Sequence, residues 1–132
     1  MKTPRWIDRT AFLLLHAETL AEHGGLPGLR DHGTLEAAVA RPQHVHAYEP
    51  SADCARLAAA YCFGMVRGHP FNDGNKRAGF LALGLFLSLN GYELRMDQVE
   101  ATEKTFSVAA GQVTESKLAD WIRKYMFRSK QT

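Results

Sequence analysis

The residue types that could do chemistry gather in one short stretch, residues 67–77, whose sequence is Arg-Gly-His-Pro-Phe-Asn-Asp-Gly-Asn-Lys-Arg. Within it, Asn72-Asp73-Gly74 is typical of a turn, and either Asn72 or Asp73 can cap a helix that begins near Gly74. The first turn of a helix has unpaired backbone N–H groups and the positive end of the helix dipole. This helix start therefore predicts an anion site, and Gly74 would let the ligand approach the backbone closely.

Charged side chains flank this predicted anion site. Lys76 and Arg77 would add positive charge beside the anion. Arg67 either contacts the anion or only ends the preceding helix, and we expect the contact. His69 lies just before the site, and Asp73 is the only carboxylate in the stretch. These groups outline a site for phosphoryl or nucleotidyl transfer, and the alternative is a plain polar turn between two helices.

Transfer of a phosphoryl group to a hydroxyl needs a base, a metal ion and positive groups on the phosphates. A neutral imidazole accepts a proton near pH 7, so we predict His69 as the base rather than as a structural histidine. We predict that Asp73 holds Mg²⁺, a cation that prefers oxygen ligands, and its alternative use is helix capping. The residues predicted to bind the phosphates of ATP are Arg67, Gly74, Asn75, Lys76 and Arg77.

The nine residues from His69 to Arg77 resemble the signature of the Fic/Doc superfamily, whose Fic form is H-x-F-x-(D/E)-G-N-G-R-x-x-R. Lys76 stands where Fic enzymes have a glycine, and Phe80 stands where they have the last arginine. Both departures match the Doc branch, the death-on-curing toxins, whose form is close to H-x-F-x-D-x-N-K-R. Residues 24–29, 35–41 and 67–68 also resemble stretches of this superfamily.

The resemblance implies a toxin of a type II toxin–antitoxin pair that transfers the γ-phosphate of ATP to a threonine or serine hydroxyl with Mg²⁺. Elongation factor Tu is the implied target, so that translation stops. In this branch ATP is implied to bind reversed, with its γ-phosphate toward His69. Lys76 would fill the anion pocket that glycine leaves open in Fic enzymes, and Phe80 cannot supply their last arginine. Both substitutions disfavour transfer of AMP.

Two other functions stay open: transfer of AMP to a protein, and a non-catalytic co-repressor that acts with an antitoxin. The intact motif argues against the co-repressor. The chain has no Glu-Gly or Glu-Asn dipeptide, which the inhibitory motif of many Fic enzymes contains, so we expect no inhibition in cis. The resemblance implies instead a separate Phd-like antitoxin, whose C-terminal tail folds into a groove on the toxin.

Composition limits the class of protein. The 132 residues predict one domain over residues 1–132, long enough for a proper core, and the length suits a whole Doc protein. The net charge is +2 without a basic stripe, so we expect no direct nucleic-acid binding. Three leucines at 13–15 are followed at once by polar residues, and the apolar run 78–89 is too short to span a bilayer. We therefore expect a cytoplasmic protein that does not bind a membrane.

The elements that would position the motif are predicted to be helices. The first two helices are expected over 9–23 and 34–40, and the third runs to 67 from a cap at 51 or 53. The fourth is expected over 75–90. The fifth runs from a capping box at 97–100 to 110, and the sixth from 114 or 116 to 128. The helix after the motif is apolar all round, so we expect it to be buried among the others, with Phe80 facing the core. Residues 92–96 are predicted as a short strand or loop. The pattern predicts an all-α bundle of about six helices around one central buried helix.

Residues 43–50 have several interpretations. Pro42 is predicted to stop the second helix. His44 and His46 alternate with Val45, which is the period of an extended chain, and a metal pair is one interpretation, although no third ligand lies nearby. By resemblance the segment looks like the superfamily's flap, an extended β-hairpin that holds the target by strand pairing. A plain exposed loop is a nearly equal alternative.

Overall fold

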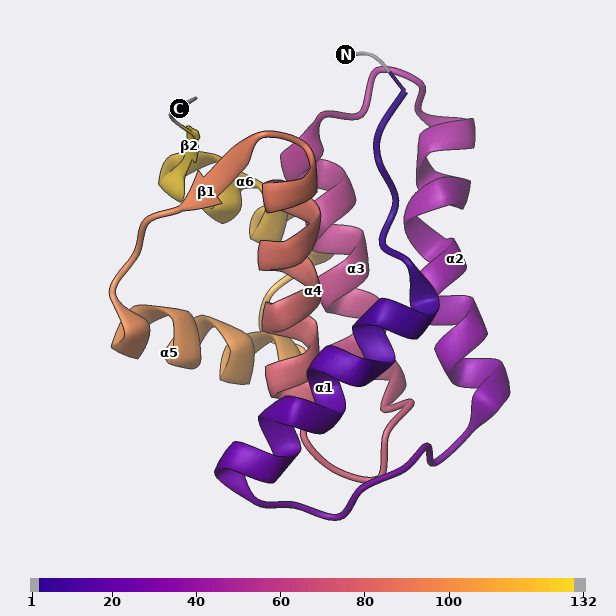
Figure 1. Cartoon of the computed structure of the whole chain (residues 1–132). Helices are drawn as coiled ribbons and strands as arrows, with labels where there is room; N and C mark the ends of the chain where they lie inside the picture. Colours follow the sequence, from indigo (N-terminus) through magenta and orange to yellow (C-terminus); the bar gives the residue numbers. More distant parts are fainter. Residues whose placement is uncertain (1–2, 130–132) are drawn as a thin grey trace.

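The computed structural model describes residues 3–129, which form six helices and one small sheet (Figure 1). The helices are α1 (Arg9–His23), α2 (His32–Tyr48), α3 (Cys54–Gly68), α4 (Asn75–Leu89), α5 (Gln98–Ala109) and α6 (Glu115–Tyr125). Strand β1 (Tyr92–Leu94) pairs antiparallel with β2 (Met126–Arg128). The predicted all-α class is confirmed. The last predicted helix was too long, because its final three residues pair with β1 instead.

Side-chain caps fix where most of the helices begin. In each case the side-chain oxygen accepts a hydrogen bond from the backbone N–H three residues ahead, which satisfies one of the unpaired donors of the first turn. The caps are Asp8 for α1, Asp31 for α2, Asp53 for α3 and Thr114 for α6. Helix α4 differs: its N-cap is Gly74, and no side chain caps its first turn. The prediction that Asn72 or Asp73 caps this helix is wrong, and the N–H groups at its start remain free of a side-chain cap.

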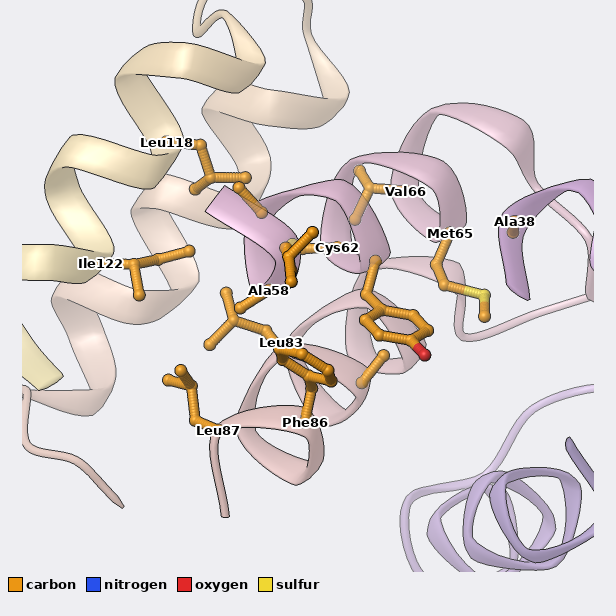
Figure 2. Packing of buried hydrophobic residues seen from close by; sticks show 14 of the residues in the cluster. Ala38, Ala58, Cys62, Met65, Val66, Leu83, Phe86, Leu87, Leu118 and Ile122 are labelled. Atoms are coloured by element: carbon orange, nitrogen blue, oxygen red, sulfur yellow. The ribbon is translucent and has the colours of Figure 1, made fainter. Parts of the chain in front are cut away.

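Helices α3 and α4 pack against each other at the centre of the molecule. Figure 2 shows Leu83, Phe86 and Leu87 of α4 lying against α3, with α6 contributing Leu118 and Ile122 to the same cluster. Tyr61 of α3 is fully buried, and its hydroxyl accepts a hydrogen bond from the N–H of Ile7 at 3.1 Å. Because both helices are anchored by this core, the loop that joins them, residues 69–74, is held at both ends.

Helix α2 corrects the prediction for residues 40–50. It continues through Pro42 to Tyr48, although an interior proline removes a helix hydrogen bond and normally costs about 3 kcal/mol. Packing outweighs this cost: Pro42 is buried, Val45 packs on the core, and the ring of His46 meets Trp6 at 5.8 Å between centroids. The extended flap and the exposed loop predicted for 43–50 are therefore wrong. Within the described chain, no three His, Cys, Asp or Glu side chains gather to hold a metal, so the histidine metal pair finds no support.

The extended segment beside the 69–74 loop is the α1–α2 connection, residues 24–31. Leu29 and Phe71 form an antiparallel bridge. On either side of it, the N–H of Asn72 donates to the carbonyl of Gly28 at 3.1 Å, and the N–H of Arg30 donates to the carbonyl of Pro70 at 2.8 Å. Figure 1 shows both connections at the same end of the bundle. Across the described residues, none of the helices has the length and apolar character needed to cross a membrane.

Candidate active site

The loop between α3 and α4 lines a cavity of about 660 Å³, within the range of small-molecule sites. Helix α1 forms one side of this cavity and α5 the other, through residues such as Thr19 and Thr102. Six of the seven predicted site residues line it: His69, Asp73, Gly74, Asn75, Lys76 and Arg77. The structure thus brings the predicted base, metal ligand and phosphate-binding residues together around one space.

His69 is held in an unusual backbone conformation. It is the C-cap of α3 with φ 56° and ψ 57°, and among the described residues it alone has a positive φ without being glycine. A left-handed conformation of this kind costs a non-glycine residue about 1–2 kcal/mol. Arg30 fixes it, because its Nε donates to the His69 carbonyl at 2.5 Å. The imidazole is exposed at the cavity, where it can accept a proton from an incoming hydroxyl.

The Asp73 carboxylate is fixed by the backbone around it. Oδ2 accepts a hydrogen bond from the N–H of Leu26 at 3.2 Å, and Oδ1 accepts one from the N–H of Gly74 at 2.9 Å. These two hydrogen bonds, with Arg77 nearby, lower the pKa of Asp73 and keep it ionised. Mg²⁺ is commonly held by one or two carboxylates together with substrate phosphates, so a single ionised aspartate beside the predicted phosphate-binding residues fits this cation.

The start of α4 is open toward the cavity. Gly74 has φ 72°, and a Cβ there would lie 3.0 Å from Cε1 of His16, so only glycine fits. Arg77 is half-buried, and its Nη1 is buried without a hydrogen-bond partner. An unpaired buried donor is costly, so this atom marks where an acceptor is missing. Lys76 is exposed, with its Nζ 5.1 Å from the ring centroid of Phe106 on α5.

Two predicted phosphate-binding residues are used by the protein itself. Asn75 clamps the loop: its Nδ2 donates to the carbonyl of Phe71 at 3.0 Å, and its Oδ1 accepts from the N–H of Phe71 at 2.9 Å. Arg67 does not line the cavity. Its Nη1 donates to the carbonyls of Val108 and Ala109 at the end of α5, at 3.3 and 3.2 Å. Arg67 thus anchors α5, and its contact with phosphate stays a prediction.

Sequence reasoning missed His16, which lies buried beneath the loop. Its Nε2–H donates to the backbone carbonyl of Asp73 at 3.2 Å, and its ring packs on Phe71 with 3.8 Å between centroids. Burial lowers the pKa of His16, so the imidazole is neutral. The available signal was its position: His16 falls between Leu13 and Leu20 on the stripe of α1 that faces the protein.

Phe80 also differs from its prediction. It is half-buried and lines the cavity, whereas the core-facing side of α4 is formed by residues such as Ala82 and Leu83. The prediction that Phe80 faces the core is wrong, because one stripe of α4 lies along the cavity.

Fold and site together define a class of protein: a helical bundle in which an H-x-F-x-D-x-N-K-R loop places a histidine, a carboxylate and an open helix start around one cavity. Residues 6–87 match the model of the Fic/DOC family. The chain is 37% identical over 120 residues to "Protein kinase doc" of Escherichia phage P1, covering 91% of this chain and 94% of that protein. It is 44% identical over 78 residues to "Toxin Doc" of Mycolicibacterium smegmatis, covering 56% of this chain and 58% of that one. The chain belongs to the Fic/DOC family, in its Doc branch, as the motif predicted.

Proposed function

We propose that this protein is a Doc-type toxin kinase that transfers the γ-phosphate of ATP to a serine or threonine hydroxyl of another protein. The observation that carries the proposal is the buried, unpaired Nη1 of Arg77, which lies at an open helix start in the same cavity as His69 and Asp73. A phosphate oxygen is the acceptor that this arrangement lacks. The relatives named "Protein kinase doc" and "Toxin Doc" support the same assignment.

Each group then has one task in the reaction. His69 accepts the hydroxyl proton as the hydroxyl oxygen bonds to the γ-phosphorus, and the bond from that phosphorus to the bridging oxygen breaks to release ADP. Lys76, Arg77 and the first N–H groups of α4 bind the phosphate oxygens. Asp73 would hold Mg²⁺, which when bound neutralises phosphate charge. Asn75 and His16 keep the loop in the shape that this requires.

Target and control are part of the proposal. We propose elongation factor Tu as the acceptor, so that phosphorylation stops translation, and a Phd-like antitoxin in trans as the inhibitor. Lys76 and Phe80 favour the kinase over AMP transfer, because they stand where AMP-transferring relatives of the motif have glycine and arginine. The intact His69 favours an enzyme over a co-repressor without catalysis.

Expression in a bacterial host, followed by mass analysis of elongation factor Tu, tests the proposal. The variants are His69→Ala and His32→Ala, since His32 is an exposed histidine at the start of α2, away from the cavity. We expect growth arrest and a phosphoryl adduct with wild type and His32→Ala, and neither with His69→Ala. An AMP adduct would overturn the kinase assignment. Growth arrest by His69→Ala would favour the co-repressor.

A further inference from the structure

A larger cavity lies on another side of the bundle, between α2 and α3, which pack along each other (Figure 1). This α2–α3 groove has a volume of about 830 Å³. Its α2 wall is a stripe of exposed residues at intervals of three or four positions: Ala37, Arg41, His44 and Tyr48. None of these side chains has a task in the reaction proposed above, so the groove is open to another use.

The groove ends beside His69. Helices α2 and α3 meet there, since a Cβ on Gly68 would lie 3.1 Å from Cγ2 of Thr34. Thr34 and Gly68 both line the groove, and His69 follows Gly68 in the chain. Arg30 donates to the carbonyls of Gly68 and His69, at 3.0 and 2.5 Å. Among the described residues, none lines both this groove and the 660 Å³ cavity. The groove therefore leads to the predicted base by a route separate from the phosphate-binding residues.

Positive charge exceeds negative charge in the groove. Three arginines line it: Arg41, Arg56 and Arg67. Two carboxylates oppose them, Glu49 on the lining and Glu115, which pairs with Arg41 and Arg56. Three positive charges against two negative ones leave an excess of one. Arg67 donates to backbone carbonyls, which do not neutralise its charge. The groove is therefore complementary to a segment that has carboxylates.

Apolar surface lies between these charges. Ala37 is exposed in the groove, and Val45 and Phe63 are half-buried there. Tyr48, near the end of α2, leaves 89% of its surface exposed. Aromatic residues and arginine are enriched where proteins bind one another. From Thr34 to Tyr48 the wall is about 21 Å long, which is enough for about four turns of helix. The groove thus fits a segment that is apolar on one face and acidic at its edges.

We propose that the α2–α3 groove binds an acidic, amphipathic segment of the acceptor protein and brings the acceptor hydroxyl to His69. The inference rests on the proposed function, which needs a protein acceptor beside His69. In-line transfer puts the acceptor and the leaving ADP on opposite sides of the γ-phosphorus, and two separate routes to His69 allow this. The segment predicted as a flap then has a task, because His44 and Tyr48 hold the acceptor from a helix and not by strand pairing.

Opposite charges at one exposed position test this inference. The measurement is the initial rate of γ-label transfer to purified elongation factor Tu, at saturating Mg²⁺-ATP, against the concentration of the factor. We expect His44→Glu to raise the KM for the factor about fivefold and His44→Lys to lower it about twofold. The kcat and the KM for ATP should stay within about twofold of wild type. The matched control is Gln43→Glu, at an exposed position of α2 outside the groove, which should keep the KM within about twofold.

A pair of bulky substitutions tests the shape of the groove. Ala37→Trp would fill the groove, whereas Ala47→Trp adds the same ring at an exposed position of α2 that does not line it. We expect Ala37→Trp to raise the KM for the factor about tenfold, because the ring competes with the segment for space. Ala47→Trp should leave this KM within about twofold of wild type. Equal KM values in these two variants would contradict docking in the groove.

The remaining outcomes also decide the inference. Equal KM values for His44→Glu, His44→Lys and Gln43→Glu would overturn it, because no acidic segment would then lie in the groove. A fall in kcat at an unchanged KM would overturn it too, since the groove would then act on the chemistry. A wild-type dimer that His44→Glu dissociates in sedimentation, with no change in KM, would give the groove to a second copy. The proposed function fails differently: wild type itself would transfer no γ-label to the factor, and the inference would fail with it.

Discussion

At the residue scale, the motif divides into groups that face the ligand and groups that hold the loop. His69 and Arg77 line the cavity, and Nη1 of Arg77 has no hydrogen-bond partner, whereas both polar atoms of Asn75 are bonded to the backbone of Phe71. His16 lies outside the motif and, like Asn75, holds the loop, because it forms a hydrogen bond with the carbonyl of Asp73. A motif residue is therefore not always a ligand-binding residue, and a supporting residue can lie more than fifty positions away.

His16→Phe should impair the site, although His16 does not line the cavity. The substitution keeps an aromatic ring on Phe71 but leaves the partly buried Asp73 carbonyl without its donor, which costs about 1 kcal/mol. We expect a lower melting temperature and a higher Mg²⁺ concentration for half-maximal activity. His16→Gln, whose amide can still donate, should recover part of both. If His16→Phe matches wild type in Mg²⁺ dependence, His16 does not position Asp73.

The sequence predicted which motif residues lie together better than it predicted the residues that support them. Residue types and spacing were enough to predict that His69, Asp73 and Arg77 surround one space, because a short contiguous loop needs no knowledge of the fold. His16 was missed because its role depends on how α1 crosses the loop. Phe80 was misplaced because a wholly apolar helix does not reveal which of its faces is left uncovered.

At the element scale, segments without regular structure determine how the loop is held. The α1–α2 connection pairs with the loop through Leu29 and donates to Asp73 through Leu26. Helix α2, by contrast, continues through Pro42 because its packing outweighs the local preference. Local sequence rules predicted that the helix breaks at Pro42. They could not include the burial of this part of α2, which stabilises the helix across the proline.

Gly25→Ala and Gly24→Ala form a matched pair in this connection. Both glycines have a positive φ, 133° and 82°, so each substitution should lose about 1 kcal/mol of stability through backbone strain. Gly25→Ala should lose somewhat more, because its Cβ would lie 2.8 Å from Cδ2 of Leu20, whereas a Cβ at Gly24 meets nothing within 4 Å. Only a Cβ at Gly25 approaches Asp73, at 3.2 Å from Oδ2. We therefore expect Gly25→Ala to weaken Mg²⁺-dependent activity, and Gly24→Ala to change stability alone. Equal activity losses in the two variants would show that the contact with Asp73 does not matter.

Arg67→Ala tests what Arg67 does for α5. Loss of its bonds to the Val108 and Ala109 carbonyls should lower stability by about 1 kcal/mol. If Arg67 acts only as this anchor, tripolyphosphate affinity, measured by calorimetry, should stay near the wild-type value. A large loss of tripolyphosphate binding would instead establish the phosphate contact predicted from the sequence.

At the scale of the whole molecule, an ion pair joins the last helix, α6, to the start of the central helix α3. Asp53 caps α3 and also accepts from Arg123 of α6, at 2.7 Å from Nε and 2.9 Å from Nη2. The Arg123 guanidinium, followed by the N–H of Arg56, lowers the pKa of Asp53. A carboxylate with a lowered folded-state pKa adds stability above its unfolded pKa of about 3.9, and that stability is lost as the pH falls through the folded value.

Asp53→Asn should therefore destabilise the protein in a pH-dependent way. Asparagine keeps the cap but removes the charge, so we expect a loss of about 0.5–1 kcal/mol near pH 7 for this exposed pair. The difference from wild type should shrink as the pH falls below about 4, and it should vanish below the lowered folded-state pKa, where Asp53 is protonated in both states. Urea unfolding of both proteins near pH 7 and below pH 4 measures this difference in the free energy of unfolding. Asp120→Asn, at the more exposed partner of Arg123, is the control and should show a smaller difference.

A kinase and an AMP transferase differ in which phosphorus of ATP reaches the acceptor hydroxyl near His69. The most direct measurement is label transfer to purified elongation factor Tu from ATP labelled at the γ-phosphate or, separately, at the α-phosphate, with wild type, His69→Ala and His32→Ala. We predict γ-label on the acceptor with wild type and His32→Ala, reduced at least about a hundredfold in His69→Ala. Label from the α-phosphate would contradict the kinase account and identify an AMP transferase.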